Sequence, residues 1–248
     1  MIKFVKKYMT ILWKIWFLMY MIFSTLLFFP ILYLSIIVFK NYELTFKIYR
    51  IWAWSICISI GIWPSISGVE KLPKNSNFII LSNHTSYLDI IVSYTRIHHH
   101  YAFLAKEELK KAPLFNINFK GMNVTVNRKS AISGKESMTE CQEKLKQNIN
   151  LLIFPEGTCS ITAPSMRSFK NGAFKLAIET QTDLVPIAFL DNYKWLNNGK
   201  KTFENHGGPG KSRIVVLDPI STKNKTLNDL ENLKSEVFSK IQTAVLNG

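Results

Sequence analysis

The sequence has few cysteines, and their spacing suits neither cross-linking nor metal binding. Its 248 residues include three cysteines, Cys57, Cys141 and Cys159, which lie far apart and form no CxxC pair. An odd, scattered set predicts neither a disulfide framework nor a zinc knuckle. We therefore expect the chain to reside in a reducing compartment.

Acidic residues are also scarce, with 17 Asp and Glu against 31 Lys and Arg, so the formal net charge is +14. Such a balance suits nucleic acid, an anionic membrane surface, or acidic substrates and carriers. Roughly half of the excess lies in the first 64 residues, and no dense arginine run or RNA-binding signature is found. We expect no nucleic-acid partner. A non-catalytic membrane-binding or nucleic-acid-binding protein stays open as an alternative that salt-dependent DNA binding would favour.

Charge is missing altogether from residues 15–39, an apolar run long enough to cross a hydrocarbon core of roughly 30 Å as a helix. Pro30 lies inside this run and predicts a kink. No small-x-small cleavage site follows, so a secretory signal peptide is not indicated. The run predicts attachment to a membrane.

A second apolar segment, residues 51–64, is too short to span a bilayer and contains Trp52, Trp54 and Trp63, which favour the headgroup interface. Basic residues flank both segments, so the positive-inside rule gives no orientation. A spanning helix and a bent hairpin that dips into one leaflet are both open, and we favour the hairpin. Residues 1–67 are predicted to form a membrane-associated helical segment.

Residues 68–248 lack internal repeats and low-complexity linkers, and apolar strand-like runs alternate in them with helical patterns. This order predicts one α/β domain, with a mixed, largely parallel sheet flanked by helices. Thr226 and Asp229 have the spacing of a capping box and predict the start of a final helix. The expected strands are residues 77–81, 101–105, 122–126, 149–154, 184–189 and 213–220, and the expected helices are residues 86–97, 106–115, 134–148 and 172–180.

The stretch IILSNHTSYLDI places His84 and Asp89 directly after an expected strand, where open α/β sheets usually carry their sites. A carboxylate five positions after a histidine can return to the imidazole, hold one tautomer and make the other nitrogen a better base. The alternative is an ordinary cap of the following helix. The pair is a candidate for general-base catalysis.

Two further polar clusters follow expected strands. In FPEGT, Glu156 and Gly157 can direct a carboxylate and backbone N–H groups into a crevice, although an ordinary turn has the same sequence. Arg128 ends GMNVTVNR and can bind a phosphate or carboxylate with its planar fork, although solvated arginines are common. Arg167 and Lys170 add positive charge before a helix that begins with glycine.

Taken in order, these blocks resemble the glycerolipid acyltransferase family. Its NHxxxxD block corresponds to Asn83, His84 and Asp89, and its glycine-to-arginine block corresponds to residues 121–128. The PEGT block corresponds to residues 155–158, and the final V-P-[IV] block to residues 185–187. The resemblance covers roughly residues 68–220 and extends to the tryptophan-rich apolar N-terminus.

The resemblance implies a glycerol-3-phosphate acyltransferase-like fold and an O-acyltransferase that needs no metal or organic cofactor. His84 would take the proton of a substrate hydroxyl and Asp89 would orient it, so no covalent acyl-enzyme is required. The acceptor would be a lysolipid, first 1-acylglycerol-3-phosphate, and the donor an acyl-carrier protein or coenzyme A thioester. We expect phosphatidic acid as the product, at the cytoplasmic face of the inner (plasma) membrane. The acceptor would be bound by Arg128, Glu156, Gly157, Thr158, Arg167 and Lys170, with backbone N–H groups near Gly157 as candidate oxyanion donors.

The chain departs from the family pattern after its PEGT block. Cys159 stands where the family usually has an arginine assigned to the acceptor phosphate, and a cysteine supplies neither the charge nor the fork. Asn127 stands where an aspartate is common. A different lysophospholipid or a lyso-aminolipid is therefore the alternative acceptor.

A lipid hydrolase with Cys159 as nucleophile and His84 as base is the competing enzyme class, although the chain lacks a GxSxG elbow. The run from His98 to His100 suggests a metal site, but adjacent histidines rarely converge on one ion. We interpret this run as a polar loop between a helix and a strand.

Overall fold

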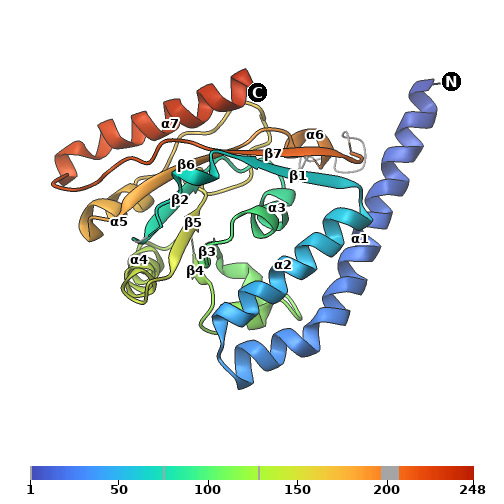
Figure 1. Ribbon diagram of the computed structural model, residues 1–248, viewed down its shortest axis with the longest axis horizontal. Helices are drawn as coiled ribbons and strands as arrows, with labels where there is room; N and C mark the ends of the chain where they lie inside the picture. The colour runs from blue at the N-terminus through green and yellow to red at the C-terminus, as the bar shows by residue number, and fades with distance from the viewer. Residues whose placement is uncertain (1, 75, 128, 197–206) are drawn as a thin grey trace.

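The computed structural model describes residues 2–74, 76–127, 129–196 and 207–248. Within these residues the chain forms a seven-stranded mixed sheet with helices on both faces (Figure 1), which confirms the predicted fold class. The strand order across the sheet is β1-β7-β6-β2-β5-β3-β4. The strands are β1 (Ile62–Ser67), β2 (Phe78–Ser82), β3 (Tyr101–Lys106), β4 (Val124–Val126), β5 (Asn150–Ile153), β6 (Asp183–Phe189) and β7 (Gly210–Val216).

Parallel pairing dominates the sheet, and only the β6–β7 pair is antiparallel among the described strands. The central strands β2 and β5 are buried along their whole length, as their continuous apolar sequences predict for parallel strands covered on both faces. Because β2, β5 and β6 run parallel side by side, their carboxyl ends meet at one edge of the sheet. The segments that follow these three strands build the candidate site.

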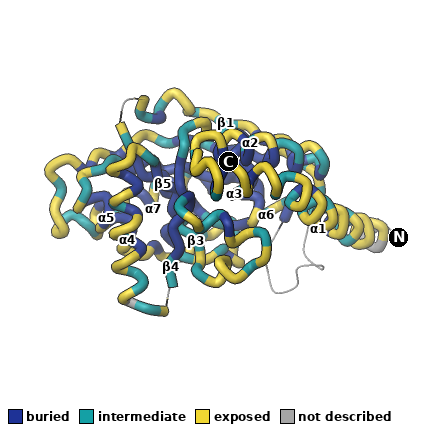
Figure 2. The backbone as a smooth tube through the Cα atoms, turned by 90° about the horizontal axis from the view of Figure 1, so that it is seen from below, coloured by how far each residue is buried: buried dark blue, intermediate teal, exposed yellow. Residues whose placement is uncertain are grey.

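Helices cover the two faces in two layers, each with its own apolar core. One core joins α1, α2 and α3 to one face of the sheet, and the other joins α4, α5 and α7 to the opposite face (Figures 1 and 2). The α-helices are α1 (Ile2–Tyr33), α2 (Tyr42–Ser59), α3 (Leu88–Arg96), α4 (Ala131–Lys146), α5 (Gly172–Thr180), α6 (Asn192–Trp195) and α7 (Leu230–Asn247).

Helices α1 and α2 form an antiparallel hairpin. A π-helical turn (Leu34–Val38) follows α1, which continues through Pro30. The indole N–H groups of Trp13 and Trp16 donate to the carbonyls of Ile60 (2.8 Å) and Ser59 (2.9 Å), so the first half of α1 lies beside the end of α2. The two helices are folded back on each other, and insertion of this hairpin into one leaflet stays a prediction.

Two details of the N-terminal prediction are wrong. Residues 62–67 are not helical as predicted, because α2 ends at Ser59 and β1 begins at Ile62 and pairs with β7. Trp52 is buried in the core that α2 forms with α3, while Trp63 is exposed. A domain boundary after residue 67 stays a prediction, but β1 already belongs to the sheet.

The other elements agree with the sequence patterns to within a few residues. The capping box at Thr226 and Asp229 is present, one 3₁₀ turn before α7. The expected helix over residues 106–115 is instead a 3₁₀ helix, Glu107–Lys111. It is short because the residue before Pro113 is disfavoured in the α conformation.

Candidate functional site

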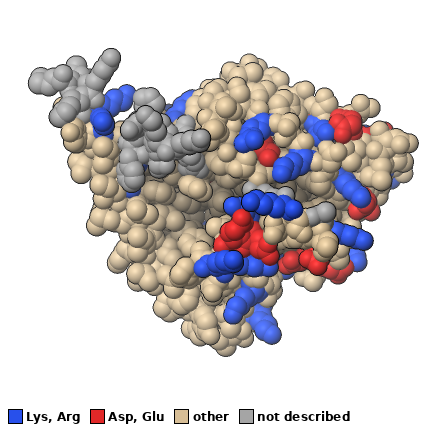
Figure 3. All heavy atoms as spheres, turned by 180° about the vertical axis from the view of Figure 1, so that it is seen from behind, with Lys and Arg blue, Asp and Glu red and all other residues tan. Residues whose placement is uncertain are grey.

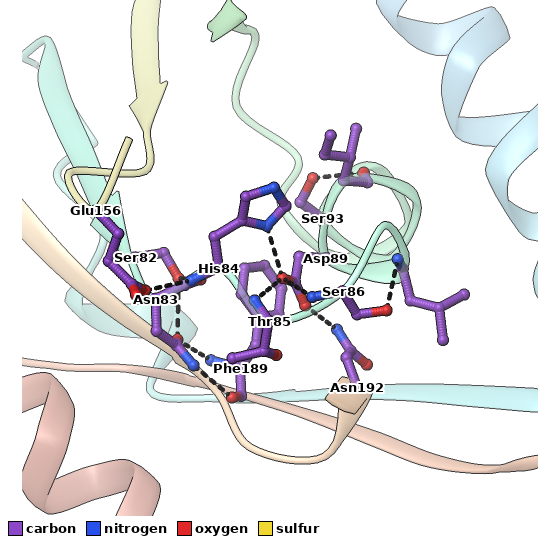
Figure 4. Close-up of polar contacts among 12 residues, drawn as sticks. Ser82, Asn83, His84, Thr85, Ser86, Asp89, Ser93, Glu156, Phe189 and Asn192 are labelled. Atoms are coloured by element: carbon purple, nitrogen blue, oxygen red, sulfur yellow. Dashed lines mark hydrogen bonds and ion pairs between the residues drawn. The ribbon is translucent and has the colours of Figure 1, made fainter. Parts of the chain in front are cut away.

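The segment after β2 is fixed to the end of β6 by one side chain. Asn83 is fully buried, its amide Nδ2 donates to the Phe189 carbonyl, and its Oδ1 accepts from the Phe189 N–H, both at 2.9 Å. This contact uses both the NH₂ group and the carbonyl oxygen of the amide. It takes the place of backbone hydrogen bonds at the point where β2 has ended. The next residue, His84, is thereby held at the carboxyl edge of the sheet (Figure 4).

His84 and Asp89 contact each other as the spacing predicts. The Nδ1 atom of His84 lies 2.9 Å from Oδ2 of Asp89. The same oxygen accepts from the backbone N–H groups of Thr85 (2.7 Å) and Ser86 (2.9 Å), which lie in the turn before α3. Oδ1 accepts from Nδ2 of Asn192 at 2.8 Å. Four donors therefore converge on a carboxylate with no exposed surface.

The imidazole of His84 lies flat against Phe154, with ring centroids 4.0 Å apart and planes 17° from parallel. Its side chain is 13% exposed. An ionised carboxylate accepts only, so its contact with Nδ1 places the imidazole proton on that nitrogen. The other ring nitrogen, Nε2, then carries the lone pair that can accept a proton.

Glu156 joins the PEGT turn to its two neighbouring segments. Its Oε1 accepts from the backbone N–H of His84 (3.0 Å) and its Oε2 from the backbone N–H of Arg167 (2.9 Å). Burial raises the pKa of this carboxyl, and the two backbone hydrogen bonds act in the opposite direction. Ser160 adds a backbone hydrogen bond to the carbonyl of His84. Glu156 thus connects the backbone at His84 to the backbone at Arg167 and holds His84 in position.

Gly157 and Lys170 lie in contact on the other side of the turn. Gly157 has a φ of +70°, and a Cβ at this position would lie 2.9 Å from Cε of Lys170. Both conditions favour glycine. The N–H of Gly157 itself donates to the carbonyl of Phe154, so this one amide is already occupied and does not serve an oxyanion.

A pocket of about 670 Å³ opens beside this turn, between α4 and α5. Phe154, which stacks on the His84 ring, lines the pocket together with Gly157 and Lys170, and Lys135 and Lys175 also belong to the lining. Lys175 is paired with Glu179 at 3.6 Å. Apolar side chains from β3, β5 and α5 form much of the remaining lining. The pocket combines apolar side chains with lysines and one glutamate, and Phe154 connects it to the candidate base.

The remaining predicted site residues are less confined. Thr158 and Arg167 are exposed, and Arg167 reaches Glu156 through its backbone N–H. Cys159 is half-buried. Arg128 lies outside the described residues. Among the described residues no group of three His, Cys, Asp or Glu side chains could hold a metal ion.

Sequence reasoning missed two parts of the site, Phe154 as the surface under the imidazole and Asn192 as a partner of Asp89. Asn192 lies 103 positions after Asp89, and only the neighbouring positions of β2 and β6 in the sheet bring them together. The available signal was the pair of polar residues, Asp191 and Asn192, directly after a buried strand.

This arrangement can perform general-base catalysis on a hydroxyl. A histidine is held in one tautomer by a buried carboxylate, is 13% exposed, and lies on an aromatic ring that also lines the neighbouring pocket. These are the properties that proton transfer from a bound alcohol requires.

Comparison with known proteins agrees with this chemistry. Residues 64–190 match the family model described as Acyltransferase. The chain is 29% identical over 198 residues to 1-acyl-sn-glycerol-3-phosphate acyltransferase alpha of Mus musculus, covering 76% of this chain and 68% of that protein. It is 30% identical over 193 residues to the chloroplastic 1-acyl-sn-glycerol-3-phosphate acyltransferase LPAT1 of Arabidopsis thaliana, covering 75% of this chain and 51% of that protein.

The chain spans less than two thirds of the length of several curated relatives that it matches. The fold is similar to the crystal structure of the 1-acyl-sn-glycerophosphate acyltransferase PlsC from Thermotoga maritima, with a TM-score of 0.69 and 24% identity. That match covers 91% of this chain and 95% of that one.

Proposed function

Since this chain belongs to the Acyltransferase family, we propose that it transfers a fatty acyl group from a thioester donor to the free hydroxyl of a lysophospholipid. The first acceptor in this proposal is 1-acylglycerol-3-phosphate, which gives phosphatidic acid. The observation that carries it is the 2.9 Å contact between His84 Nδ1 and the buried Asp89 carboxylate. This contact leaves a partly open imidazole nitrogen as the base of the site.

The reaction follows from this geometry. Nε2 of His84 removes the proton of the acceptor hydroxyl while the hydroxyl oxygen attacks the thioester carbonyl carbon. The resulting tetrahedral intermediate collapses, the carbon–sulfur bond breaks, and the new ester bond remains. The leaving thiolate takes the proton back from Nε2. Asp89 offsets the positive charge that the imidazole carries between the two transfers. A positioned base of this kind contributes roughly 10²–10⁴-fold to the rate.

The pocket beside the PEGT turn is the proposed place of the acceptor headgroup. Lys170 lies against Gly157 in the lining of this pocket, and Lys135 lines it as well. Two ammonium groups near one anion offset the missing arginine at Cys159, although they lack its fork geometry. Arg128 and Arg167 remain candidates to bind the same phosphate.

The hairpin of α1 and α2 is the proposed membrane attachment. One helix among the described residues, Val5–Val38, is long and apolar enough to cross a membrane by length and composition. Most of its large apolar side chains are exposed, which is unusual on a protein surface in water. Figure 3 shows this flank nearly bare of charge, with lysines gathered near its amino-terminal end. We propose that the hairpin dips into one leaflet at the cytoplasmic face, where a soluble acyl-carrier protein or coenzyme A thioester reaches the site.

The test is a panel of acceptors analysed by mass spectrometry. Membranes containing the wild type or His84→Ala receive acyl-carrier protein or acyl-coenzyme A donors. The acceptors are 1-acylglycerol-3-phosphate, lysophosphatidylethanolamine and a lyso-aminolipid. The expected result is phosphatidic acid from the first acceptor with the wild type and its loss with His84→Ala.

The other outcomes separate the alternatives. Product from another acceptor alone keeps the chemistry and overturns the headgroup. Released fatty acid without any acylated product favours the hydrolase reading. A folded wild type that makes no product from any acceptor or donor overturns the proposal.

A further inference from the structure

One side chain outside the family motifs is built into the catalytic pair. Asn192 opens the short helix α6 after β6 and has no exposed surface. Its Nδ2 donates to Oδ1 of Asp89 at 2.8 Å (Figure 4). The other oxygen, Oδ2, is held by His84 and by two backbone N–H groups of the turn before α3. Among the described residues, Asn192 is therefore the donor to Oδ1, and it comes from the segment after β6.

The orientation of the Asn192 amide is fixed by a second buried side chain. The hydroxyl of Ser212 in β7 donates to Oδ1 of Asn192 at 2.6 Å, and Ser212 also has no exposed surface. With its oxygen occupied by a donor, the amide presents its NH₂ group to the carboxylate. Because an ionised carboxylate only accepts, the reverse orientation would bring two acceptors together. The chain Ser212–Asn192–Asp89–His84 thus has one consistent set of donors.

An ion pair lies next to this series of hydrogen bonds and holds the segments that carry Asn192 and Ser212 together. Asp191 precedes Asn192, and Arg213 follows Ser212. The Arg213 guanidinium donates to both carboxylate oxygens of Asp191 at 2.7 Å. Two cross-links therefore lie side by side between the end of β6 and the middle of β7, one charged and one uncharged. Such double fixation suits a residue whose position has to be constant.

We propose that Asn192 is a positioning residue for acyl transfer, which fixes the plane of the Asp89 carboxylate and through it the tautomer and direction of the His84 ring. The turn before α3 holds one oxygen of Asp89, which leaves rotation of the carboxylate about that point open. The hydrogen bond from Asn192 stops this rotation, and its loss leaves a buried acceptor unsatisfied. The inference rests on the proposed function, because it assigns Asn192 a part in that reaction.

The experiment compares Asn192→Leu with Asn150→Leu as a matched control. Asn150 is also buried and also uses its amide for two hydrogen bonds, to the Phe78 N–H and the His100 carbonyl. It begins β5, at the opposite edge of the sheet from the site. Both variants lose a buried amide, but only one loses a contact with the catalytic pair. Ser212→Ala serves as the milder variant of the Asn192 chain.

Three quantities are measured on the full chain: kcat, KM for each substrate, and the ¹⁵N spectrum of the histidine side chains, with His84 assigned through His84→Ala. We expect kcat of Asn192→Leu to fall by roughly 10-fold to 100-fold with KM within twofold, by analogy with hydrogen-bond partners behind metal-bound histidines. We also expect the His84 signal to move toward a mixture of tautomers. Ser212→Ala should change kcat and the spectrum in the same direction and by less.

Two results would overturn the inference. One is a folded Asn192→Leu with wild-type kcat. The other is a loss of kcat equal to that of Asn150→Leu, without a change in the His84 signal, which indicates a structural role alone. If Asn192→Leu does not fold, Ser212→Ala decides by the same measurements. The spectrum reports the contact without turnover, so an inactive wild type would refute the proposed function while leaving the link from Asn192 to His84 to be judged separately.

Discussion

The side chain of Asn83 and the backbone of Phe189 form two hydrogen bonds of 2.9 Å that continue the pairing of β2 with β6 just before His84. The first residue of the NHxxxxD block, Asn83, thus links β2 to β6 and thereby fixes the position of His84, the next residue.

Asn83→Asp keeps the size of the side chain but removes its donor, so a buried carboxylate faces the Phe189 carbonyl. We expect the free energy of unfolding to fall by at least about 1–3 kcal/mol, the usual cost of an unsatisfied buried polar group. We also expect kcat to fall, because His84 is the next residue and its position depends on these hydrogen bonds. Denaturant titration and kinetics check this. Asn232→Asp, an exposed position on α7, is the control for the added charge and should change neither quantity.

Glu156→Gln should lower both kcat and stability. The two oxygens of Glu156 accept hydrogen bonds from the backbone N–H groups of His84 and Arg167. A glutamine has only one acceptor oxygen, so its NH₂ group would face one of these two donors. The expected loss is about 1–3 kcal/mol of unfolding free energy. KM for the donor should change little if the side chain acts by bracing His84. A large rise in the acceptor KM with unchanged kcat would show instead that Glu156 contacts the substrate.

The pair of Asp191 and Arg213 predicts a pH dependence of stability. Burial acts to raise the pKa of Asp191, but hydrogen bonds from Arg213 and Lys194 outweigh it and hold this pKa below its usual value. The stabilisation is therefore complete above the ordinary aspartate pKa and is lost as the pH falls through the lowered one. We expect Asp191→Asn to be less stable than the wild type at neutral pH, with the difference shrinking in acid. Urea titrations between neutral and acidic pH measure it. A constant difference would contradict this assignment.

Replacement of Cys159 by alanine should leave the acyl transfer rate within about twofold of the wild type. Direct attack by the acceptor hydroxyl needs no thiol, and the half-buried Cys159 has no step in the proposed reaction. The mass-spectrometric assay of acylated product checks it, with His84→Ala as the inactive reference. Complete loss of activity in a folded Cys159→Ala would favour a cysteine nucleophile.

Thr226→Ala tests the capping box that precedes α7. The Thr226 side chain and the Asp229 carboxylate satisfy each other's backbone N–H groups. Removal of the threonine hydroxyl should cost about 0.5–2 kcal/mol of stability and leave kcat unchanged, because α7 lies on the sheet face without α2 and α3. Thr243→Ala, an exposed position in the same helix, is the comparison. A loss of activity at a temperature where the variant is folded would be unexpected.

The sequence was informative where local pattern decides the structure. The apolar runs of β2 and β5 and the capping box before α7 are short-range signals, and the His84–Asp89 contact spans five positions. Strand β1 escaped prediction because Trp63 and Pro64 continue the apolar run of α2, with only Ile60 and Gly61 between the helix and the strand. Its partner, β7, lies about 150 positions later, and no local pattern reports such a pairing.

The contact of Asn192 with Asp89 was missed for a related reason. Hydrophobic periodicity identifies β6 as a strand but not as the neighbour of β2, and that neighbourhood is what brings the asparagine to the carboxylate. The bracing role of Glu156 was also beyond sequence, because both of its partners are backbone groups and leave no trace in residue type.

Only Ile60 and Gly61 separate the end of α2 from the start of β1. The carbonyl of Gly61 accepts a hydrogen bond from the N–H of Gly210 in β7, and the carbonyl of Ile60 accepts one from the Trp13 indole. The junction is therefore held both by the sheet and by α1. A hairpin embedded in lipid would therefore be attached rigidly to the sheet and not through a flexible linker. The tilt of the hairpin in a bilayer would set the height and angle of His84 above the lipid surface. Lengthening the junction would then let the catalytic domain swivel away from its acceptor without altering any residue of the site.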